Sequence, residues 1–81
     1  MNEIEKINRA IDEFAGAIKA RMVEKYHEGY RGWDSKCSPS TERLAIELNR
    51  DSCELIKLND PIKAAVDIGA RAMMLWRRHN E

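Results

Sequence analysis

The chain has 81 residues, of which 14 are basic and 14 are acidic, so its formal net charge is +0. This balance gives no sign of an overall attraction to nucleic acid or to an anionic membrane, and no apolar run approaches the roughly 20 residues that span a bilayer. The length indicates a single domain over residues 1–81, near the lower limit at which one chain buries a sufficient core.

The amino terminus lacks the basic and apolar regions of a secretion signal, so we expect a cytoplasmic protein without a membrane partner. Cys37 and Cys53 have neither the close spacing of a zinc site nor the density of a disulfide scaffold. We expect both to be free thiols, although a single bridge between them stays open.

The first segment predicts one long helix over about residues 3–28. Apolar residues recur there at the 3.6-residue period for about six turns, without an internal proline: Ile4, Ile7, Ile11, Phe14, Ala15, Ile18, Met22 and Tyr26. The remaining face is charged, which is typical of a solvated surface. We expect this helix to pack on the pair of helices that follows it.

A loop over residues 29–38 and a second helix over about residues 39–58 follow. Ser38 and Pro39 are typical of a helix N-cap and first turn. One face of the helix is set by leucines, namely Leu44, Leu48, Leu55 and Leu58, and the opposite face by Ile46, Cys53 and Ile56. Because it is apolar on two sides, this helix should contact two partners.

A third helix is predicted over residues 61–79, with Asp60 as its cap, Pro61 in its first turn and Arg77 and Arg78 suited to its C-terminal dipole. Only Asn59 and Asp60 separate it from the second helix, so the two should form an antiparallel hairpin. We expect another helix to cover its main apolar stripe, Ile62, Ala65, Val66, Gly69, Met73 and Trp76, with Met74 and Ala70 pointing outward.

The predicted fold is therefore all-α, with a long N-terminal helix packed on an antiparallel hairpin. Second apolar faces remain on both hairpin helices and predict a homodimer or a higher oligomer. The residues expected at that interface are Ile46, Cys53, Ile56, Ile68 and Leu75.

Acidic residues on the hairpin allow two interpretations. Glu47, Asp51 and Glu54 share one face of the second helix, and Asp51 falls inside the leucine stripe. On the third helix, Asp67 lies four residues from both Lys63 and Arg71. These carboxylates either form ordinary ion pairs or, if the hairpin brings Asp51, Glu54 and Asp67 together, provide oxygen ligands for Mg²⁺.

Several segments from about Phe14 onward carry a family resemblance, namely Lys25-Tyr26-His27-Glu28-Gly29-Tyr30-Arg31-Gly32-Trp33, Cys53-Glu54-Leu55 and the stretch from Ala64 to Met74. Together they resemble small, phage-type MazG-like proteins of the all-α nucleoside triphosphate pyrophosphohydrolases. The resemblance implies a helical bundle, usually oligomeric, that uses Mg²⁺ to split nucleoside triphosphates into monophosphate and pyrophosphate.

This chain departs from the family's signature, Glu-Glu-x-x-Glu on one helix and Glu-x-x-Asp on the next, often with Asn three residues later. Asp51, Glu54 and Asp67 match acidic positions, and Glu47 could restore one more acid. The mismatched positions are Arg50, Ala64 and Ala70. Because Mg²⁺ needs nearly complete oxygen coordination, these replacements should weaken metal binding strongly.

The leading hypothesis is a catalytically degenerate MazG-like protein that binds a protein partner or a nucleotide and needs no cofactor. If phage-encoded, it would act in the host cytoplasm on a host system. Arg50 could grip a phosphate, or be merely exposed, and Trp33 could stack on a base, or plug the end of the bundle. The other residues assigned to nucleotide or partner binding are Lys25, Tyr30 and Arg31.

Two alternatives stay open beside this hypothesis. One is an active Mg²⁺-dependent pyrophosphohydrolase with Asp51, Glu54, Asp67 and Glu47 as metal ligands. The other is a structural oligomerisation module. No helix-turn-helix signal or glycine-rich phosphate cradle is apparent, so nothing points directly to nucleic acid.

Overall fold

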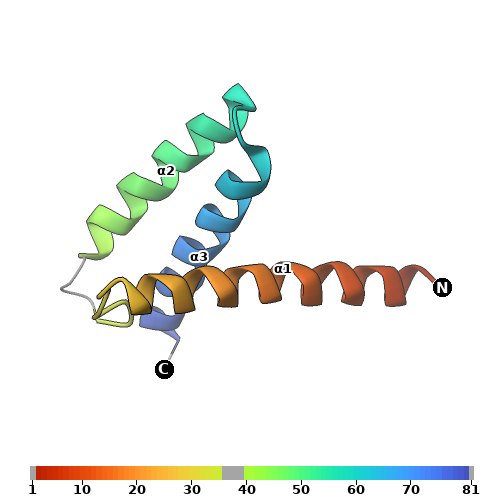
Figure 1. Cartoon of the computed structure of the whole chain (residues 1–81), viewed down its shortest axis with the longest axis horizontal. Coiled ribbons are helices and arrows are strands. Elements are labelled where there is room, and N and C mark those ends of the chain that lie inside the picture. The colour runs from red at the N-terminus through yellow and green to blue at the C-terminus, as the bar shows by residue number, and fades with distance from the viewer. Residues whose placement is uncertain (1, 36–39, 81) are drawn as a thin grey trace.

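The computed structural model describes residues 2–35 and 40–80. Within these ranges the chain forms three helices and no β-strand: α1 (Glu3–His27), α2 (Thr41–Lys57) and α3 (Pro61–His79) (Figure 1). The predicted all-α class is confirmed. None of the described helices combines the length and the apolar character needed to cross a membrane.

Side-chain caps fix where the helices begin. Asn2, Ser40 and Asp60 are the N-caps, and the carboxylate of Asp60 accepts a 3.1 Å hydrogen bond from the backbone N–H of Lys63. Each cap satisfies a backbone donor that the first helical turn leaves unpaired. The predicted cap and first turn at Ser38 and Pro39 lie outside the described residues, and the N-cap of α2 is Ser40.

Helices α2 and α3 form the predicted antiparallel hairpin (Figure 1). Leu58 ends α2 in the left-handed conformation, at φ 56°, and α3 begins three residues later. The apolar side chains buried between the two helices are Leu44, Ala64, Ala70 and Met74. Two of the four are alanines, which allow the helix axes to approach closely.

The prediction of which side chains of α3 are covered is wrong at four positions. Ala70 and Met74, predicted to point outward, are 1% and 2% exposed, whereas Ile62 and Trp76 of the predicted covered stripe are 79% and 61% exposed. The reason is that α2 packs against the alanine face of α3. The predicted stripe meets only α1, which crosses it near its middle, at Gly69.

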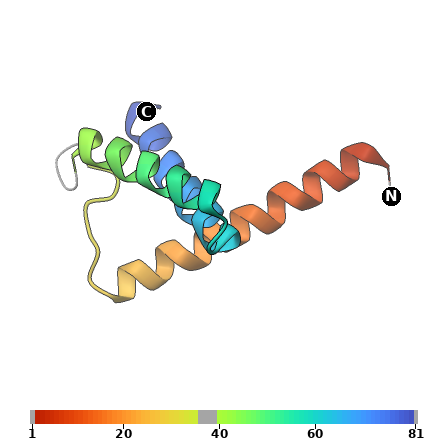
Figure 2. The same cartoon turned by 90° about the horizontal axis from the view of Figure 1, so that it is seen from above.

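Helix α1 crosses α3 closely at Gly69. A Cβ added there would lie 2.4 Å from Cζ of Phe14 and 2.8 Å from Cδ1 of Ile18, both on α1. Among the described residues, α1 contacts α3 but makes no backbone contact with α2. The N-terminal half of α1 therefore extends away from the hairpin (Figures 1 and 2).

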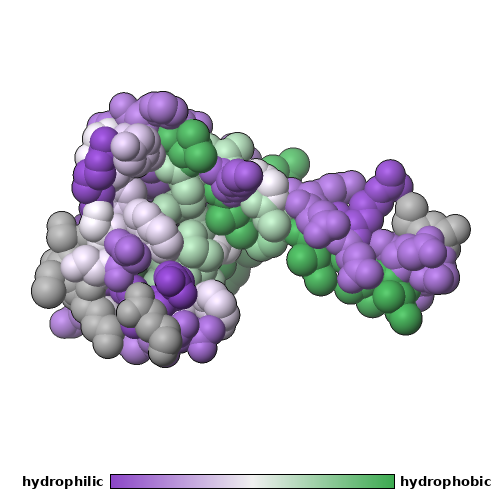
Figure 3. All heavy atoms as spheres, turned by 90° about the horizontal axis from the view of Figure 1, so that it is seen from below, coloured by the Kyte–Doolittle hydropathy of each residue, from purple (hydrophilic) through white to green (hydrophobic). Residues whose placement is uncertain are grey.

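The predicted packing of α1 on the hairpin takes place on α3 and covers only part of the apolar stripe of α1. Ile4, Ile7 and Ile11 are 70%, 51% and 59% exposed, and no residue of α1 is fully buried. Figure 3 shows green, apolar patches along one side of the projecting segment. The stripe continues past the point where α3 crosses α1, so the hairpin covers only part of its length.

Candidate functional site

Two of the candidate acidic residues meet at one arginine between the hairpin helices. Arg71 of α3 donates from Nε to Glu47 at 3.2 Å and from Nη1 to Asp51, both on α2. The three side chains are between 14% and 19% exposed. Arg43 donates to the other carboxylate oxygen of Glu47 at 2.9 Å. A cation thus lies between the two carboxylates, with charge-assisted hydrogen bonds to both.

The surroundings of Glu47 lower the pKa of its carboxyl group. Burial alone raises the pKa of this carboxyl group, but hydrogen bonds from Arg43 and Arg71 stabilise the charged form and leave the pKa below its ordinary value. Glu47 therefore keeps its negative charge into mildly acidic solution. The ion pair with Arg71 persists over the same range.

Asp67 lies on a different side of α3, facing α1. Its residue is 8% exposed, and its two carboxylate oxygens accept from Nε of Arg21 and Nζ of Lys63, each at 3.3 Å. Of its two predicted partners, Lys63 is present, whereas Arg71 turns to α2 instead. Asp67 therefore ties α1 to α3, and its buried charge is paired.

Glu54 is on the exposed part of α2, 3.4 Å from Lys57. Within the described ranges, no group of three or more His, Cys, Asp or Glu side chains could hold a metal ion. The donor set around Arg71 does not fit Mg²⁺, because a guanidinium fills the space between the only two of the four candidate acids that come together.

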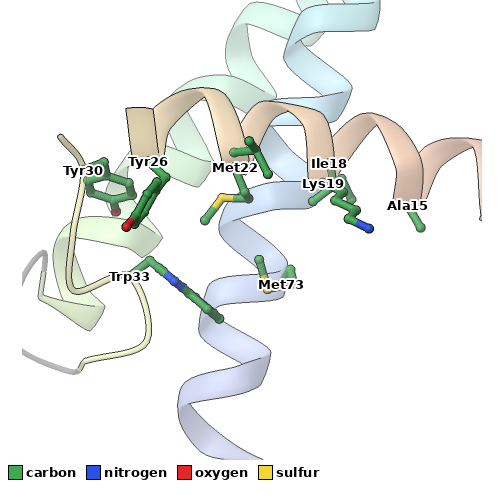
Figure 4. A pocket seen from close by; sticks show the side chains of 9 residues that line it. Ala15, Ile18, Lys19, Met22, Tyr26, Tyr30, Trp33 and Met73 are labelled. Carbon is green, nitrogen blue, oxygen red and sulfur yellow. The ribbon is translucent and has the colours of Figure 1, made fainter. Parts of the chain in front are cut away.

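A groove of about 520 Å³ opens between α1, the loop after it and α3. In Figure 4, Met22 and Tyr26 extend from α1 towards the side on which Trp33 lies, and Met73 completes the wall from α3. The walls are almost entirely apolar, and Lys19 stands at the rim. The full lining is Ala15, Ile18, Lys19, Met22, Val23, Tyr26, Tyr30, Trp33 and Met73.

The loop that carries Trp33 is held against α3 by Arg78. This arginine is only 4% exposed and donates from Nε to the carbonyl oxygen of Trp33 at 2.9 Å and from Nη1 to Oγ1 of Thr41 at 3.4 Å. Sequence reasoning gave Arg78 only a role at the helix dipole. The only signal in the sequence is a basic residue in the last turn of the helix, which does not reveal burial.

Tyr30 forms a second attachment of the loop. Its hydroxyl donates to Sδ of Met74 at 3.7 Å, and burial raises the pKa of this hydroxyl above its ordinary value, although nearby Arg78 and Arg71 act in the opposite direction. Together with Arg78, this contact gives one wall of the groove a defined position.

Four of the five residues predicted to bind a nucleotide or partner lie together. Lys25 stands over the ring of Tyr30 at 5.4 Å, and Cζ of Arg31 lies 3.7 Å from the centre of the Tyr26 ring. Arg31 also donates to the carbonyl oxygens of Tyr26 and Tyr30. Its guanidinium is therefore used to shape the loop. Arg50 is exposed on α2, away from this group.

The predicted oligomer interface is uncovered on α2, where Ile46 is 54% and Ile56 80% exposed beside an exposed free thiol at Cys53. Ile68 and Leu75 are half-buried on α3. Cys37 lies outside the described residues. Comparison of the chain with protein-family models, curated proteins and solved structures finds no match.

Proposed function

We propose that this chain is a non-catalytic protein-interaction module whose groove binds an amphipathic helix. The observation that carries the proposal is the apolar groove itself, which is open to solvent and walled by Met22, Tyr26, Trp33 and Met73. Aromatic and methionine side chains adapt well to the apolar face of a helix. Binding of a helix in such a groove is a recurrent mode of peptide recognition.

The ion pairs favour this function over Mg²⁺-dependent hydrolysis. Glu47, Asp51 and Asp67 are each paired with arginine, so a metal would have to displace a guanidinium at every one of these carboxylates. The proposal agrees with the catalytically degenerate MazG-like protein that the sequence predicts.

The groove favours a protein over a nucleotide as its ligand. A triphosphate needs several free cations or backbone donors, whereas the groove is lined by apolar groups and has Lys19 at its rim. The guanidinium of Arg31, which lies over the Tyr26 ring, already donates hydrogen bonds to the carbonyl oxygens of Tyr26 and Tyr30.

A displayed library of amphipathic helical peptides, selected on the purified chain, tests the proposal. We expect enriched peptides to have apolar residues at i, i+3, i+4 and i+7, and to lose binding when Met73→Glu places a charge in the groove. Ile56→Glu, on the exposed side of α2, is the matched control and should leave binding unchanged. Peptides that bind the Met73→Glu and parent chains equally would contradict the proposal, as would the absence of any enrichment.

An activity assay separates this function from the enzymatic alternative. We expect no pyrophosphate to be released from a panel of ribonucleoside and deoxyribonucleoside triphosphates with Mg²⁺. Turnover that EDTA abolishes and Mg²⁺ restores would show that the chain uses a metal, and the interaction module would then be rejected in favour of the hydrolase.

A further inference from the structure

We infer that the groove is filled by a second copy of this chain, through its arm, which we define as residues 3–14 of α1. The two α1 helices then pair antiparallel about a two-fold axis near Ala15. This inference rests on the proposed function, because it names the helix that the groove binds. It differs from the sequence expectation, which placed the oligomer interface on α2 and α3.

The apolar stripe of α1 supports this pairing because it continues from the arm into the groove. Ile4, Ile7 and Ile11 lie on the same helical face as Ile18, Met22 and Tyr26. An antiparallel pair centred on Ala15 places Ile4 of one copy against Tyr26 of the other. It also places Ile7 near Met22, and Ile11 near Ile18. Each arm thus meets the other copy's groove, as a closed, self-complementary interface requires.

The charges on α1 are arranged for the same antiparallel pairing. Residues 3–14 carry four carboxylates (Glu3, Glu5, Asp12, Glu13) against two cations (Lys6, Arg9). Residues 15–27 carry three cations (Lys19, Arg21, Lys25) against one carboxylate (Glu24); Arg21 is paired with Glu24 and Asp67, which leaves Lys19 and Lys25 for the second copy. An antiparallel pair therefore places an acidic half against a basic half at both ends, whereas a parallel pair would place like against like.

Asp12 and Lys19 form the most specific part of this match. Both are exposed, and neither forms an ion pair within the described residues. They flank the stripe on the same side, and a two-fold axis near Ala15 places each opposite the other in the second copy. The pair would form twice per dimer.

The core of a single chain is small, so a second copy would stabilise the fold by burying apolar side chains that one chain leaves exposed. Among residues 2–35 and 40–80, the buried apolar residues are Leu44, Ala64, Ala70 and Met74, and α1 buries none of its own. A helix of 25 residues is about 37 Å long, and α3 covers only its middle. Pairing would remove Ile4, Ile7 and Ile11 from water twice over, a favourable contribution of about 1.5–3 kcal/mol for each side chain that becomes fully buried.

The mass in solution, measured by sedimentation or light scattering, tests the interface. We expect the parent chain to have twice the mass of one chain. Ile7→Asp should raise the dimer dissociation constant about 100-fold, because the charge enters the interface twice. Ile56→Asp is the matched control on α2 and should leave the constant unchanged. A monomeric parent chain would overturn the inference, as would a dimer that Ile56→Asp disrupts and Ile7→Asp does not.

Charge reversal tests the antiparallel register without touching the apolar stripe. Lys19→Glu alone and Asp12→Lys alone should each weaken the dimer about tenfold, since each places like charges opposite one another. The double variant should recover the parent constant to within about threefold. If the double variant's loss of dimerisation free energy equals the sum of the two single losses, the proposed register is wrong.

Cysteine crosslinking locates the axis and separates this inference from the proposed function. In a Cys37→Ser, Cys53→Ser background, Ala15→Cys should form an intermolecular disulfide rapidly, and Ala17→Cys, on the other side of α1, should not. Equal crosslinking at both positions would overturn the inference. If library peptides bind the groove while the parent chain stays monomeric, the inference fails and the proposed function stands.

Discussion

Nε of Arg71 on α3 lies 3.2 Å from Oε2 of Glu47 on α2, and the same guanidinium donates to Asp51 one turn further along α2. One side chain thus joins the two hairpin helices through two carboxylates. These are two of the four carboxylates that the sequence offers as possible Mg²⁺ ligands. The hairpin uses them for its own stability.

Replacing Arg71 by methionine should destabilise the chain. The change keeps much of the side-chain volume but leaves two half-buried carboxylates without their cation, so the free energy of unfolding should fall by about 2–4 kcal/mol. Denaturant unfolding followed by circular dichroism measures the loss. Arg50→Met, at an exposed neighbouring position, should change stability by less than about 0.5 kcal/mol. Equal effects of the two changes would show that the Arg71 ion pairs contribute little.

The lowered pKa of Glu47 predicts a loss of stability in acid. Because the folded state holds this carboxyl group below its ordinary value of 4.5, the unfolded chain binds the proton first as pH falls. The stabilisation is therefore complete above about pH 4.5 and disappears as pH falls through the folded-state pKa. Unfolding measured across this range should show a shallower pH dependence for Glu47→Gln than for the parent chain. Glu13→Gln, on the exposed face of α1, should retain the parent's slope.

Asp67→Asn should destabilise the chain without any dependence on metal. The substitution removes the charge that pairs with Arg21 and Lys63, so we expect the free energy of unfolding to fall by about 1–3 kcal/mol. Thermal unfolding with Mg²⁺ and with EDTA should give the same difference between variant and parent. A difference that grows in Mg²⁺ would identify Asp67 as a metal ligand. Asp34→Asn, in the loop after α1, serves as the exposed control.

Two glycines in similar helical settings should respond oppositely to substitution. Gly69→Leu should separate α1 from α3, because even a Cβ at this position would lie 2.4 Å from Phe14; we expect a loss of about 1–3 kcal/mol. Gly16→Ala, where nothing lies within 4 Å of the added Cβ, should stabilise α1 by about 0.5–1 kcal/mol. Urea unfolding of both variants measures the contrast. A neutral Gly69→Leu change would mean that the crossing tolerates displacement of α1.

Leu58 offers a stabilising substitution at the end of α2. Its left-handed backbone, at φ 56°, costs energy for any residue with a Cβ, and its side chain is 69% exposed. Leu58→Gly should therefore raise the melting temperature, by an amount equivalent to about 0.5–1 kcal/mol. Leu58→Val, which is β-branched, should lower it. A lower melting temperature for Leu58→Gly would show that the leucine side chain packs more than its exposure indicates.

The helices and the hairpin were predictable because their signals are local. Asp60 and Pro61 mark the start of α3 through capping chemistry, and the two-residue connection before α3 leaves α2 no direction other than antiparallel. The period of α1 likewise indicates its length correctly. A repeat of 3.6 residues predicts a helix and identifies its apolar face, but it does not depend on what that face contacts.

The contacts between helices could not be predicted in the same way. Met74 and Trp76 belong to two apolar faces of α3, and sequence alone does not tell which face α2 covers. The same ambiguity affected Arg71, whose spacing from Asp67 fits an intrahelical pair although its partners are on α2. The groove arises only when α1, the loop and α3 meet, so no single segment carries a signal for it.

The way α1 is attached has a consequence for how the protein opens. Because α1 makes backbone contacts with α3 and none with α2 among the described residues, the first helix can detach while the hairpin keeps its own small core. Amide protons in α2 and α3 should then exchange with solvent through a rarer, larger opening than those of α1. A single molecule would thus contain two cooperative units, the hairpin and α1. The less stable unit, α1, carries the arm through which we infer that a second copy binds.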